Sequence, residues 1–399
     1  MRARPLKLAG VLTLAVALLV SPQTVSASTT TGTLAQPTAV EYTADSRLND
    51  ADLPTDPVTF DECEQNYTAP GPYWFKNRFN ICRTVILQII YRKLENGVPT
   101  EVGRGYFRST LIGIAQDKES RIRFGLRVKY VTTDGEEISD GHLTFGLECF
   151  NNDPQRTSVC DHPAEPVDRT VAEWHAGVDP LYWDATTTTT TVPEEKYKTE
   201  SRGFFSFDLV ESSIFVGPPD VVRQPQEFFR CDSASYATRG SRCVFTSVTP
   251  TLVFDLNDPT YHESAAFIKD AQEDLTQINP RLVGKKVPGR SGEQTLTYLH
   301  PSYDVGNTKT GSRSKVRRVC KADSGARYTK DANGNARQCD EYPFASTYQN
   351  SARVDESTVW SFAAKAIAAS HNEAGGRLLA SWYGREHMLD GDGFYVVVR

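Results

Sequence analysis

The sequence lacks the short motifs of several large enzyme classes. It contains no HExxH zinc-protease motif, no GxSxG nucleophile elbow and no phosphate-binding loop of the GxxxxGKS or GxxxxGKT type. No CxxC pair occurs, which argues against a zinc ribbon or a thioredoxin-like redox site. The seven histidines show no metal-ligand spacing. Paired carboxylates do occur, so residue types alone leave a glycosidase open.

Long apolar runs are scarce, and the single one lies near the N-terminus. Leu8–Val20 would span about 20 Å as a helix, which is too short for a membrane core of about 30 Å. Three basic residues precede this run and the small residues Val25-Ser26-Ala27 follow it, which is typical of a secretory signal peptide. We therefore predict a signal peptide over 1–27 and a secreted, extracellular mature chain without a membrane span. An uncleaved anchor is the alternative.

The remaining composition is that of an ordinary globular protein. The 399 residues are 39% hydrophobic and 24% charged, which excludes collagen-like, disordered and multi-span membrane chains. This length allows two or three domains. The formal net charge of −6 gives no sign that the chain as a whole binds nucleic acid.

The chain has eight cysteines, which is consistent with secretion because cysteines of secreted domains commonly form disulfides. They fall in sequential pairs 11 to 19 positions apart, so pairing between neighbours is the natural interpretation. Eight cysteines allow 105 connectivities, and the sequence alone leaves the others open. The predicted pairs are Cys63–Cys82, Cys149–Cys160, Cys231–Cys243 and Cys320–Cys339.

The first part of the mature chain is predicted to be mostly strand. Residues 28–57 are rich in Thr, Ser and Ala and should form a flexible N-terminus. Apolar and polar residues alternate from Ile122 to Tyr130, which is the period of a strand with one solvated face. Asn96-Gly97 predicts a hairpin turn, and Asp134-Gly135 predicts a hairpin into the next strand. We expect residues 58–255 to form an antiparallel β-sandwich-like domain. Strands are expected at 84–91, 122–130, 142–149, 203–210 and 243–255, and a loop at the six-threonine run 186–191.

The pattern changes after Asn257, and we predict a separate C-terminal α+β domain over 256–399. Leu378–Trp382 and Leu379–Tyr383 form i,i+4 pairs that belong on the buried face of a helix. The expected elements are a helix over 261–277, a turn-rich segment over 280–335, helical stretches over 357–370 and 373–387, and a final strand over 394–398.

Positive charge is concentrated in one segment of this C-terminal domain. Residues 281–340 hold 13 Lys and Arg against 5 Asp and Glu, a net charge of +8 on a chain that is acidic elsewhere. Such a segment indicates an anionic partner. A solvated basic loop without a partner would show the same composition.

Two short constellations follow the basic segment. In Cys339-Asp340-Glu341-Tyr342-Pro343-Phe344-Ala345-Ser346, two carboxylates stand beside a predicted disulfide. In Ser370-His371-Asn372-Glu373-Ala374-Gly375-Gly376, Asn372 has the residue type of a helix N-cap. A side-chain oxygen at a helix start can instead face a hard cation, together with a carboxylate from a preceding strand.

These two stretches and the closing Leu389-Asp390-Gly391-Asp392-Gly393-Phe394-Tyr395-Val396-Val397-Val398 resemble the secreted NucA/NucB-type bacterial deoxyribonucleases. The resemblance covers about residues 281–399, and the preceding β-rich part resembles no family that we can name. It implies a non-specific endonuclease with a fold resembling the ββα-metal nucleases. In that fold, a strand supplies the general base and the following helix supplies a metal ligand.

The resemblance also implies roles for individual residues. Asp340 would be the general base, where related nucleases have a histidine, and Asn372 would be the metal ligand. Asp340 and Asn372 together would hold one divalent ion, Mg²⁺ or Mn²⁺. Position 371 is acidic in relatives but is His371 here, which puts a carboxylate ligand at this position in doubt.

The chemistry of phosphodiester hydrolysis agrees with these roles, because it needs an activated water and neutralised phosphate charge. Glu341 should point away from Asp340 in an extended strand, and we assign it a supporting catalytic role. Basic side chains of the charged segment would hold phosphates without reading bases. The candidates are Arg313, Lys315, Arg317, Arg318 and Lys321.

The sequence therefore predicts a secreted, divalent-metal-dependent, sequence-nonspecific endonuclease that cleaves DNA. A fragment of about 256–399 should then bind DNA as well as the full chain does. One alternative is a nuclease toxin with an N-terminal delivery module and a cell-surface or immunity-protein partner. A second is a non-catalytic extracellular binding or adhesion protein. RNA is an equally acceptable substrate, since no element that reads a 2′-hydroxyl is visible.

Overall fold

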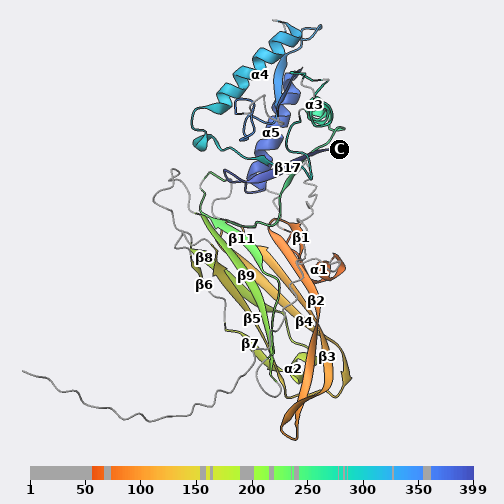
Figure 1. Cartoon of the computed structure of the whole chain (residues 1–399). Helices are drawn as coiled ribbons and strands as arrows, with labels where there is room; N and C mark the ends of the chain where they lie inside the picture. The colour runs from red at the N-terminus through yellow and green to blue at the C-terminus, as the bar shows by residue number, and fades with distance from the viewer. Residues whose placement is uncertain are drawn as a thin grey trace, which may run out of the picture. The chain divides into compact units, whose positions relative to one another are not determined.

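The computed structural model covers the whole chain, and the described residues begin at Asp56 (Figure 1). The predicted signal peptide and nearly all of residues 28–57 lie outside them. No helix within the described ranges is long and apolar enough to cross a membrane. Residues 202–214 are described by their backbone alone. The described ranges are 56–66, 73–152, 159–161, 165–188, 202–214, 220–234, 236–237, 242–276, 278–281, 284, 286–325, 328–353 and 361–399.

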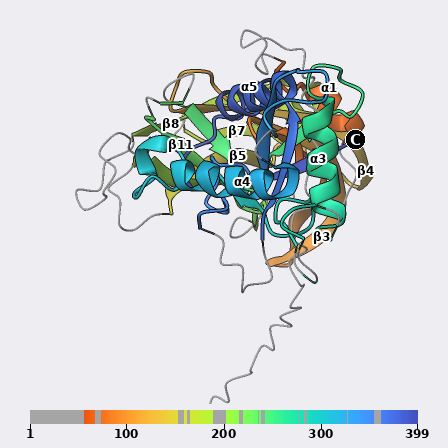
Figure 2. The ribbon, with the colours of Figure 1, turned by 90° about the horizontal axis from the view of Figure 1, so that it is seen from above.

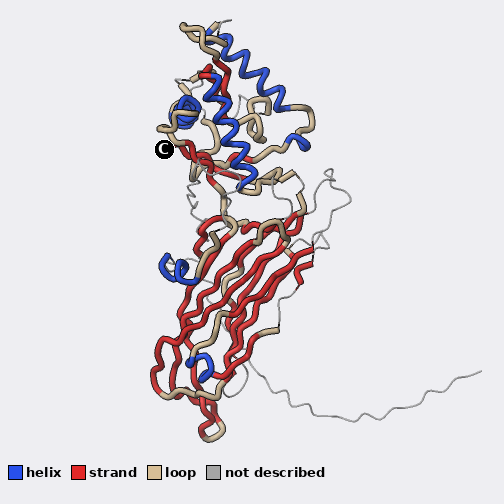
Figure 3. Tube along the Cα trace, turned by 180° about the vertical axis from the view of Figure 1, so that it is seen from behind, coloured by secondary structure: helices blue, strands red, loops and turns tan. Residues whose placement is uncertain are grey.

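Strands dominate the β-rich region (Figure 3) and form two six-stranded sheets with antiparallel pairing throughout. The first sheet has the order β1 (Trp74–Asn77), β2 (Asn80–Glu95), β3 (Val98–Ala115), β4 (Arg121–Gly135), β8 (Leu181–Thr188) and β6 (Val159–Asp161). The second has the order β12 (Arg242–Phe245), β11 (Glu227–Asp232), β9 (Arg202–Ile214), β5 (His142–Asn151) and β7 (Val167–Thr170), and β10 (Asp220–Arg223) also pairs with β9.

The two sheets share one hydrophobic core. Phe107 and Phe124 of the first sheet and Phe145 and Phe229 of the second are almost fully buried in the same cluster. Along β4, the residues at 122, 124, 126 and 128 are buried while 123 and 129 are exposed, which confirms the predicted alternation. The β-rich character of this region is therefore as predicted.

One predicted hairpin is confirmed and one is wrong. Asn96 and Gly97 both have positive φ, 53° and 81°, in the tight turn between β2 and β3. The predicted hairpin at Asp134-Gly135 is wrong, because β4 pairs with β3 and β8, whereas β5 pairs with β7 and β9 in the other sheet. A Cβ on Gly135 would lie 2.6 Å from the carbonyl oxygen of Val102. The glycine thus permits close backbone contact at the end of β4 before the chain crosses over.

The threonine run is also corrected in part. Thr186–Thr188 end β8 and pair with β6, so they are strand and not the predicted loop. Threonine is β-branched and suits a pleated strand when a partner is present. Residues 189–191 lie outside the described residues.

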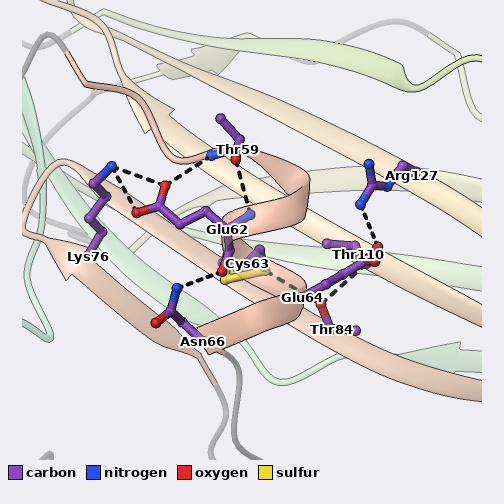
Figure 4. The surroundings of a disulfide bond; sticks show 10 residues. Thr59, Glu62, Cys63, Glu64, Asn66, Lys76, Thr84, Thr110 and Arg127 are labelled. Carbon is purple, nitrogen blue, oxygen red and sulfur yellow. Dashed lines mark hydrogen bonds and ion pairs between the residues drawn. A yellow bond between two sulfur atoms is a disulfide. The ribbon is translucent and has the colours of Figure 1, made fainter.

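Two short helices flank the sheets. Helix α1 (Phe60–Asn66) is tied to β2 by the Cys63–Cys82 disulfide (Figure 4). Within this setting, Glu64 accepts hydrogen bonds from Thr110 at 3.0 Å and from Arg127 at 2.7 Å. Helix α2 (Val171–Ala176) begins with a capping box between Thr170 and Glu173.

All four predicted disulfides are confirmed. The bonds are Cys63–Cys82, Cys149–Cys160, Cys231–Cys243 and Cys320–Cys339, and no cysteine among the described residues is free. The first three lie in the β-rich region, and the last joins two elements of the C-terminal region.

The C-terminal region is α+β, as predicted, and has its own hydrophobic core. Figure 2 shows its main helices, and each of them contacts the small sheets of this region. The helices are α3 (His262–Glu273), α4 (Thr308–Ser324) and α5 (Ala369–Arg385), with a short 3₁₀ helix, η2 (Pro301–Tyr303). One sheet has the order β13 (Thr251–Phe254), β17 (Gly393–Val398) and β14 (Leu296–Thr297), and the other pairs β15 (Arg337–Tyr342) with β16 (Ala363–Ala368).

The predicted helices at 261–277 and 373–387 and the final strand are confirmed, with shifted ends. The predicted helix over 357–370 is wrong from 363 to 368, which is β16. Alanine favours a helix, but here Ala363 and Ile367 pack into one core cluster and Ala364 and Ala366 into another. Burial on alternating faces therefore overrides the local propensity.

The turn-rich segment predicted over 280–335 is wrong from 308 to 324, where α4 forms. The first half of α4 is rich in Ser and Thr and contains Gly311, all of which disfavour helix interiors. Asp304 compensates, because its carboxylate accepts the backbone N–H groups of Thr308 at 2.9 Å and Lys309 at 2.8 Å. Ser312, Val316 and Cys320 are buried at a spacing of four residues.

Buried charges connect the β-rich region to the C-terminal region. Arg78 donates to the backbone oxygen of Glu386 at 2.8 Å, and Arg230 forms an ion pair with Asp392. Asp232 contacts the His387 ring at 3.0 Å. All of these side chains except that of Asp392 are at least 96% buried.

Candidate active site

A cleft of about 830 Å³ opens among α3, α4, β15 and α5. Asp340 and Glu341, neighbours on β15, both line it. The pairing of β15 with β16 and the Cys320–Cys339 disulfide to α4 fix the backbone of the two acids. The sequence thus places two carboxylates on a braced strand at the wall of one cleft.

Asp340 is partly buried and is held by hydrogen bonds on both oxygens. Ser264 of α3 donates to Oδ2, and the backbone N–H of Glu341 donates to Oδ1 at 2.8 Å. Burial raises the pKa of Asp340 to about 6, and the two hydrogen bonds partly oppose that rise. The carboxylate is consequently a better proton acceptor than an ordinary aspartate.

Glu341 is bound to the opposite helix. Its Oε2 accepts a hydrogen bond from Ser312 of α4 at 2.7 Å. Burial raises the pKa of Glu341 to about 7, the Ser312 hydrogen bond lowers it, and the charge of Asp340 raises it further. The two acids are thus held by different helices, although both reach the cleft.

Asn372 lines the same cleft from α5. Its Nδ2 donates to Gln338 of β15 at 3.0 Å, and Gln338 in turn donates to Glu373 at 2.8 Å. Among the described residues, no donor lies on the Oδ1 of Asn372. The N-cap interpretation of Asn372 is wrong, because α5 begins at Ala369 and Ala368 occupies the cap position without a side-chain hydrogen bond.

The predicted phosphate-binding residues all fall on α4, but only some of them face the cleft. Arg313 and Arg317 line it, together with Lys309, which the sequence analysis missed. Lys315 instead donates to the Ser351 carbonyl oxygen at 3.1 Å and lies over the Phe362 ring. Arg318 and Lys321 are exposed and do not line the cleft.

Helical spacing explains this division. Positions 309, 313 and 317 recur every four residues and therefore form one stripe on α4, beside the buried stripe 312, 316 and 320. Burial lowers the pKa of Lys309, and the charge of Arg313 lowers it further. The stripe would have been visible in the sequence if the segment had been recognised as a helix.

Three polar residues that orient the site also escaped the sequence analysis. They are Ser264, Ser312 and Gln338, which hold Asp340, Glu341 and Asn372 respectively. Serine and glutamine at these positions carry no distinctive motif, and Ser264 lies 76 positions from its partner. Only the fold brings these residues to their partners.

The β-rich region contributes to the rim of the cleft as well. Tyr236 lines it, stacks on the His300 ring with centroids 4.0 Å apart, and accepts the backbone N–H of Asp390 at 3.1 Å. The backbone N–H of His300 also donates to Oδ1 of Asp390 at 2.9 Å. The aromatic wall therefore includes a residue from outside the C-terminal region.

Chemically, the cleft combines oxygen ligands, a proton acceptor and a row of cations. Such a set can bind a polyanion, hold a hard divalent cation through carboxylate and amide oxygens, and activate water. His371, next to Asn372, does not line the cleft.

Comparison with known proteins finds a family match for most of the region around this cleft. No curated protein and no solved structure matches the chain. The family model described as Deoxyribonuclease NucA/NucB matches residues 290–397, which include α4, β15, β16 and α5. The β-rich region and α3 lie outside the match. Residues 290–397 of the C-terminal region are therefore similar to the NucA/NucB deoxyribonuclease family.

Proposed function

We propose that the protein is a secreted, divalent-metal-dependent endonuclease that hydrolyses DNA without sequence specificity. One observation carries the proposal: Asp340, Asn372 and the α4 cations Arg313 and Arg317 line one cleft within a domain of a deoxyribonuclease family. The proposal also treats the chain as two domains, since the β-rich and C-terminal regions each have their own hydrophobic core. Leu252 and Phe254 of β13 belong to the C-terminal core, so the boundary lies before β13 and not after residue 255 as predicted.

The order of elements supports a ββα-metal interpretation of the site. β15 and β16 pair antiparallel, and α5 follows β16 directly. The proposed base, Asp340, lies on the first strand, and the proposed metal ligand, Asn372, lies on the helix.

The residues of the cleft fit a hard cation. The Oδ1 of Asn372 carries no donor among the described residues, and its amide nitrogen is fixed by Gln338, so the oxygen is oriented and available. Asp340 would be the second ligand, and both are oxygen donors of the kind that Mg²⁺ and Mn²⁺ prefer. A bound ion would supply Lewis-acid stabilisation of the phosphate and of the leaving oxygen.

The chain's own residues would perform the remaining tasks. Asp340, oriented by Ser264, would accept the proton of the attacking water. Glu341 would have a supporting role, since its carboxyl group is fixed by Ser312 beside Asp340. Lys309, Arg313 and Arg317 would bind successive phosphates through charge, which confers affinity without base recognition.

Secretion rests on the sequence of the first 27 residues and is supported by the four disulfides. A toxin with the β-rich region as delivery module, and a non-catalytic binding protein, are the competing functions. The intact pair Asp340 and Asn372 in one cleft favours an active enzyme over the latter.

The test is incubation of tag-free residues 28–399 with plasmid DNA and with RNA, in Mg²⁺, in Mn²⁺ and after exhaustive chelation. We expect nicking and linearisation of plasmids of unrelated sequence, loss of cleavage with EDTA, and recovery when the ion is restored. Asp340→Asn serves as the matched inactive control. Full activity after chelation would contradict metal dependence, and cleavage of RNA alone would contradict the substrate.

A further inference from the structure

Two histidines and a glutamate from distant parts of the chain meet beside the cleft, outside its lining. His262 and Glu263 begin α3, and His371 lies in the first turn of α5. One ligand atom from each lies within 4.8 Å of the others. The two imidazole rings have centroids 4.3 Å apart, and the Nδ1 of His371 lies 3.8 Å from a carboxylate oxygen of Glu263. Spacing along the chain does not indicate this group, because 109 positions separate the histidines.

The carboxylate of this group is held in place by its other oxygen. The Oε2 of Glu263 accepts the backbone N–H of Ala368 at 3.0 Å and a guanidinium N–H of Arg337 at 3.2 Å. Arg337 is itself fixed, because the same nitrogen donates to the Ala366 carbonyl oxygen at 2.6 Å. Oε1 is therefore directed toward His371 and is free to accept another ligand bond.

The imidazoles differ in exposure in a way that suits ion entry. His371 has a side chain only 15% exposed, and its Nδ1 accepts a long contact of 3.4 Å from the backbone N–H of Glu263. That nitrogen therefore carries a lone pair, and a bound ion would replace its weak contact with the backbone N–H. His262 is exposed, so an ion can reach the group from solvent.

We propose that His262, Glu263 and His371 form a binding site for a borderline transition-metal ion such as Zn²⁺, distinct from the oxygen-ligand site of the cleft. Two imidazole nitrogens and one carboxylate oxygen are a preferred ligand set for Zn²⁺, with water as the fourth ligand, whereas Mg²⁺ prefers oxygen alone. Bond lengths of about 2.0–2.2 Å require the three side chains to close by about 1 Å. This proposal does not depend on the nuclease function.

Two positively charged features repel a cation at this site, and they determine which ions can bind there. The starts of α3 and α5 present positive helix-dipole ends, and Arg337 lies on the far side of the carboxylate. Electrostatic attraction alone would not hold an alkaline-earth ion in this place. Coordinate bonds from the imidazole nitrogens can hold Zn²⁺ despite this repulsion, so the site should bind Zn²⁺ much more tightly than Mg²⁺ or Ca²⁺.

A bound ion would join the starts of α3 and α5. These starts carry Ser264 and Asn372, each the next residue after a proposed zinc ligand. The ion should therefore stabilise the contact between the two helices that brace the cleft. Unfolding temperature is then a direct measure of occupancy, because a ligand that binds only the folded state stabilises it.

The experiment uses tag-free residues 28–399 in excess Mg²⁺, with ZnCl₂ titrated by calorimetry and thermal unfolding recorded in parallel. We expect one Zn²⁺ per chain and a rise in Tm, both lost in His262→Ala and His371→Ala. His175→Ala is the matched control, since His175 is another exposed histidine beside a carboxylate, 3.2 Å from Glu137, and should bind Zn²⁺ like the unmodified chain.

Further variants separate this site from the cleft. Asp340→Asn should retain Zn²⁺ binding, and Co²⁺ substitution should give visible absorption bands that disappear in His262→Ala. Comparable Tm values without zinc establish that the variants fold. The proposal is overturned if the unmodified chain binds no Zn²⁺, if His262→Ala binds it unchanged, or if Asp340→Asn abolishes binding.

Discussion

Burial governs how individual carboxyl groups of this protein hold their protons, and neighbouring charge decides the exceptions. Glu227 is buried and Asp340 and Glu341 are partly buried, none of them forms a salt bridge with an arginine among the described residues, and the pKa of each is raised to about 6 or 7. Burial would raise the pKa of Asp392 too, but Arg230 and Arg78 lower it to about 2. The surroundings of a carboxyl group thus decide whether its pKa is raised or lowered.

The first prediction concerns Asp340. Asp340→Asn preserves size and the hydrogen bond to Ser264 but cannot accept a proton, so we expect DNA cleavage to fall by about 10²–10⁴-fold. The rate is measured on supercoiled plasmid at saturating metal, with Tm as the check on folding. Near-normal turnover in a folded variant would assign Asp340 a purely structural role.

The second prediction concerns Glu227, which is only 4% exposed and accepts hydrogen bonds from Ser247 and the backbone of Phe228. Its folded pKa of about 7 exceeds the ordinary value of 4.5. The folded state therefore favours the protonated acid, and stability is lost as pH rises from 4.5 to 7. Glu227→Gln should be more stable than the unmodified chain above pH 7, by on the order of 3 kcal/mol.

Denaturant unfolding at pH 4.5 and pH 8 tests this prediction. The difference between Glu227→Gln and the unmodified chain should nearly vanish at pH 4.5. An equal difference at both values would show that hydrogen bonding and not ionisation distinguishes the two side chains.

At the scale of elements, α4 carries two functions on adjacent stripes. Ser312, Val316 and Cys320 attach it to β15 and β16, and Lys309, Arg313 and Arg317 face the cleft. The Cys320–Cys339 disulfide ends the attached stripe one residue before Asp340. The position of α4 therefore affects the position of the Asp340 carboxylate through this disulfide.

The third prediction separates neighbouring arginines of α4. Arg317→Gln should weaken DNA binding and lower the slope of log K against log salt by about 0.9, the effect of one lost phosphate contact on duplex DNA. Arg318→Gln is the matched control, since Arg318 does not line the cleft. Binding titrations at several salt concentrations measure both. Equal slopes in the two variants would refute the stripe.

The fourth prediction concerns the disulfide of α4 and β15. Cys320→Ala with Cys339→Ala should lower stability by about 2–4 kcal/mol and reduce cleavage even at a temperature where the protein remains folded, since the strand of Asp340 loses a brace. Cys149→Ala with Cys160→Ala, in the β-rich region, should lower stability while leaving cleavage intact. If both double variants lose cleavage equally, local bracing is not the cause.

At the scale of the whole molecule, the two regions meet through charges that are mostly buried. Arg78 and Arg230 are 4% and 3% exposed, and Asp392 of the C-terminal region faces both. Because an unpaired buried charge is strongly unfavourable, this contact argues against our expectation that residues 256–399 work alone. The fragment would lack both arginines, Asp232 and Tyr236.

The fifth prediction tests this contact in the full chain. Asp392→Asn leaves Arg78 buried without its carboxylate and leaves Arg230 with Asp232 alone, so we expect a loss of about 3–5 kcal/mol in unfolding free energy. The exposed pair Lys93–Glu136 provides the control, and Lys93→Met should change stability by less than about 1 kcal/mol. Similar losses in both variants would show that the contact between the regions contributes little.

Features that depend on neighbours along the chain could be predicted from the sequence alone. The alternation of β4, the Asn96-Gly97 turn, the neighbouring disulfide pairs and the family motifs around Asp340 and Asn372 are all local. A strand period, a positive-φ turn and a short disulfide loop each arise within some twenty residues, so composition and spacing suffice to predict them.

Features that depend on partners far away in sequence arise only in the folded chain. The sequence of β16 favours a helix, but its alternate faces pack into two hydrophobic clusters and it forms a strand. The sequence of α4 favours irregular structure, but Asp304 caps the helix and β15 covers its buried stripe. Ser264 reaches Asp340, and His262 reaches His371, only because α3 packs against β15 and α5. Burial and long-range pairing carry free energies larger than local propensities, and so they overrule them where the two disagree.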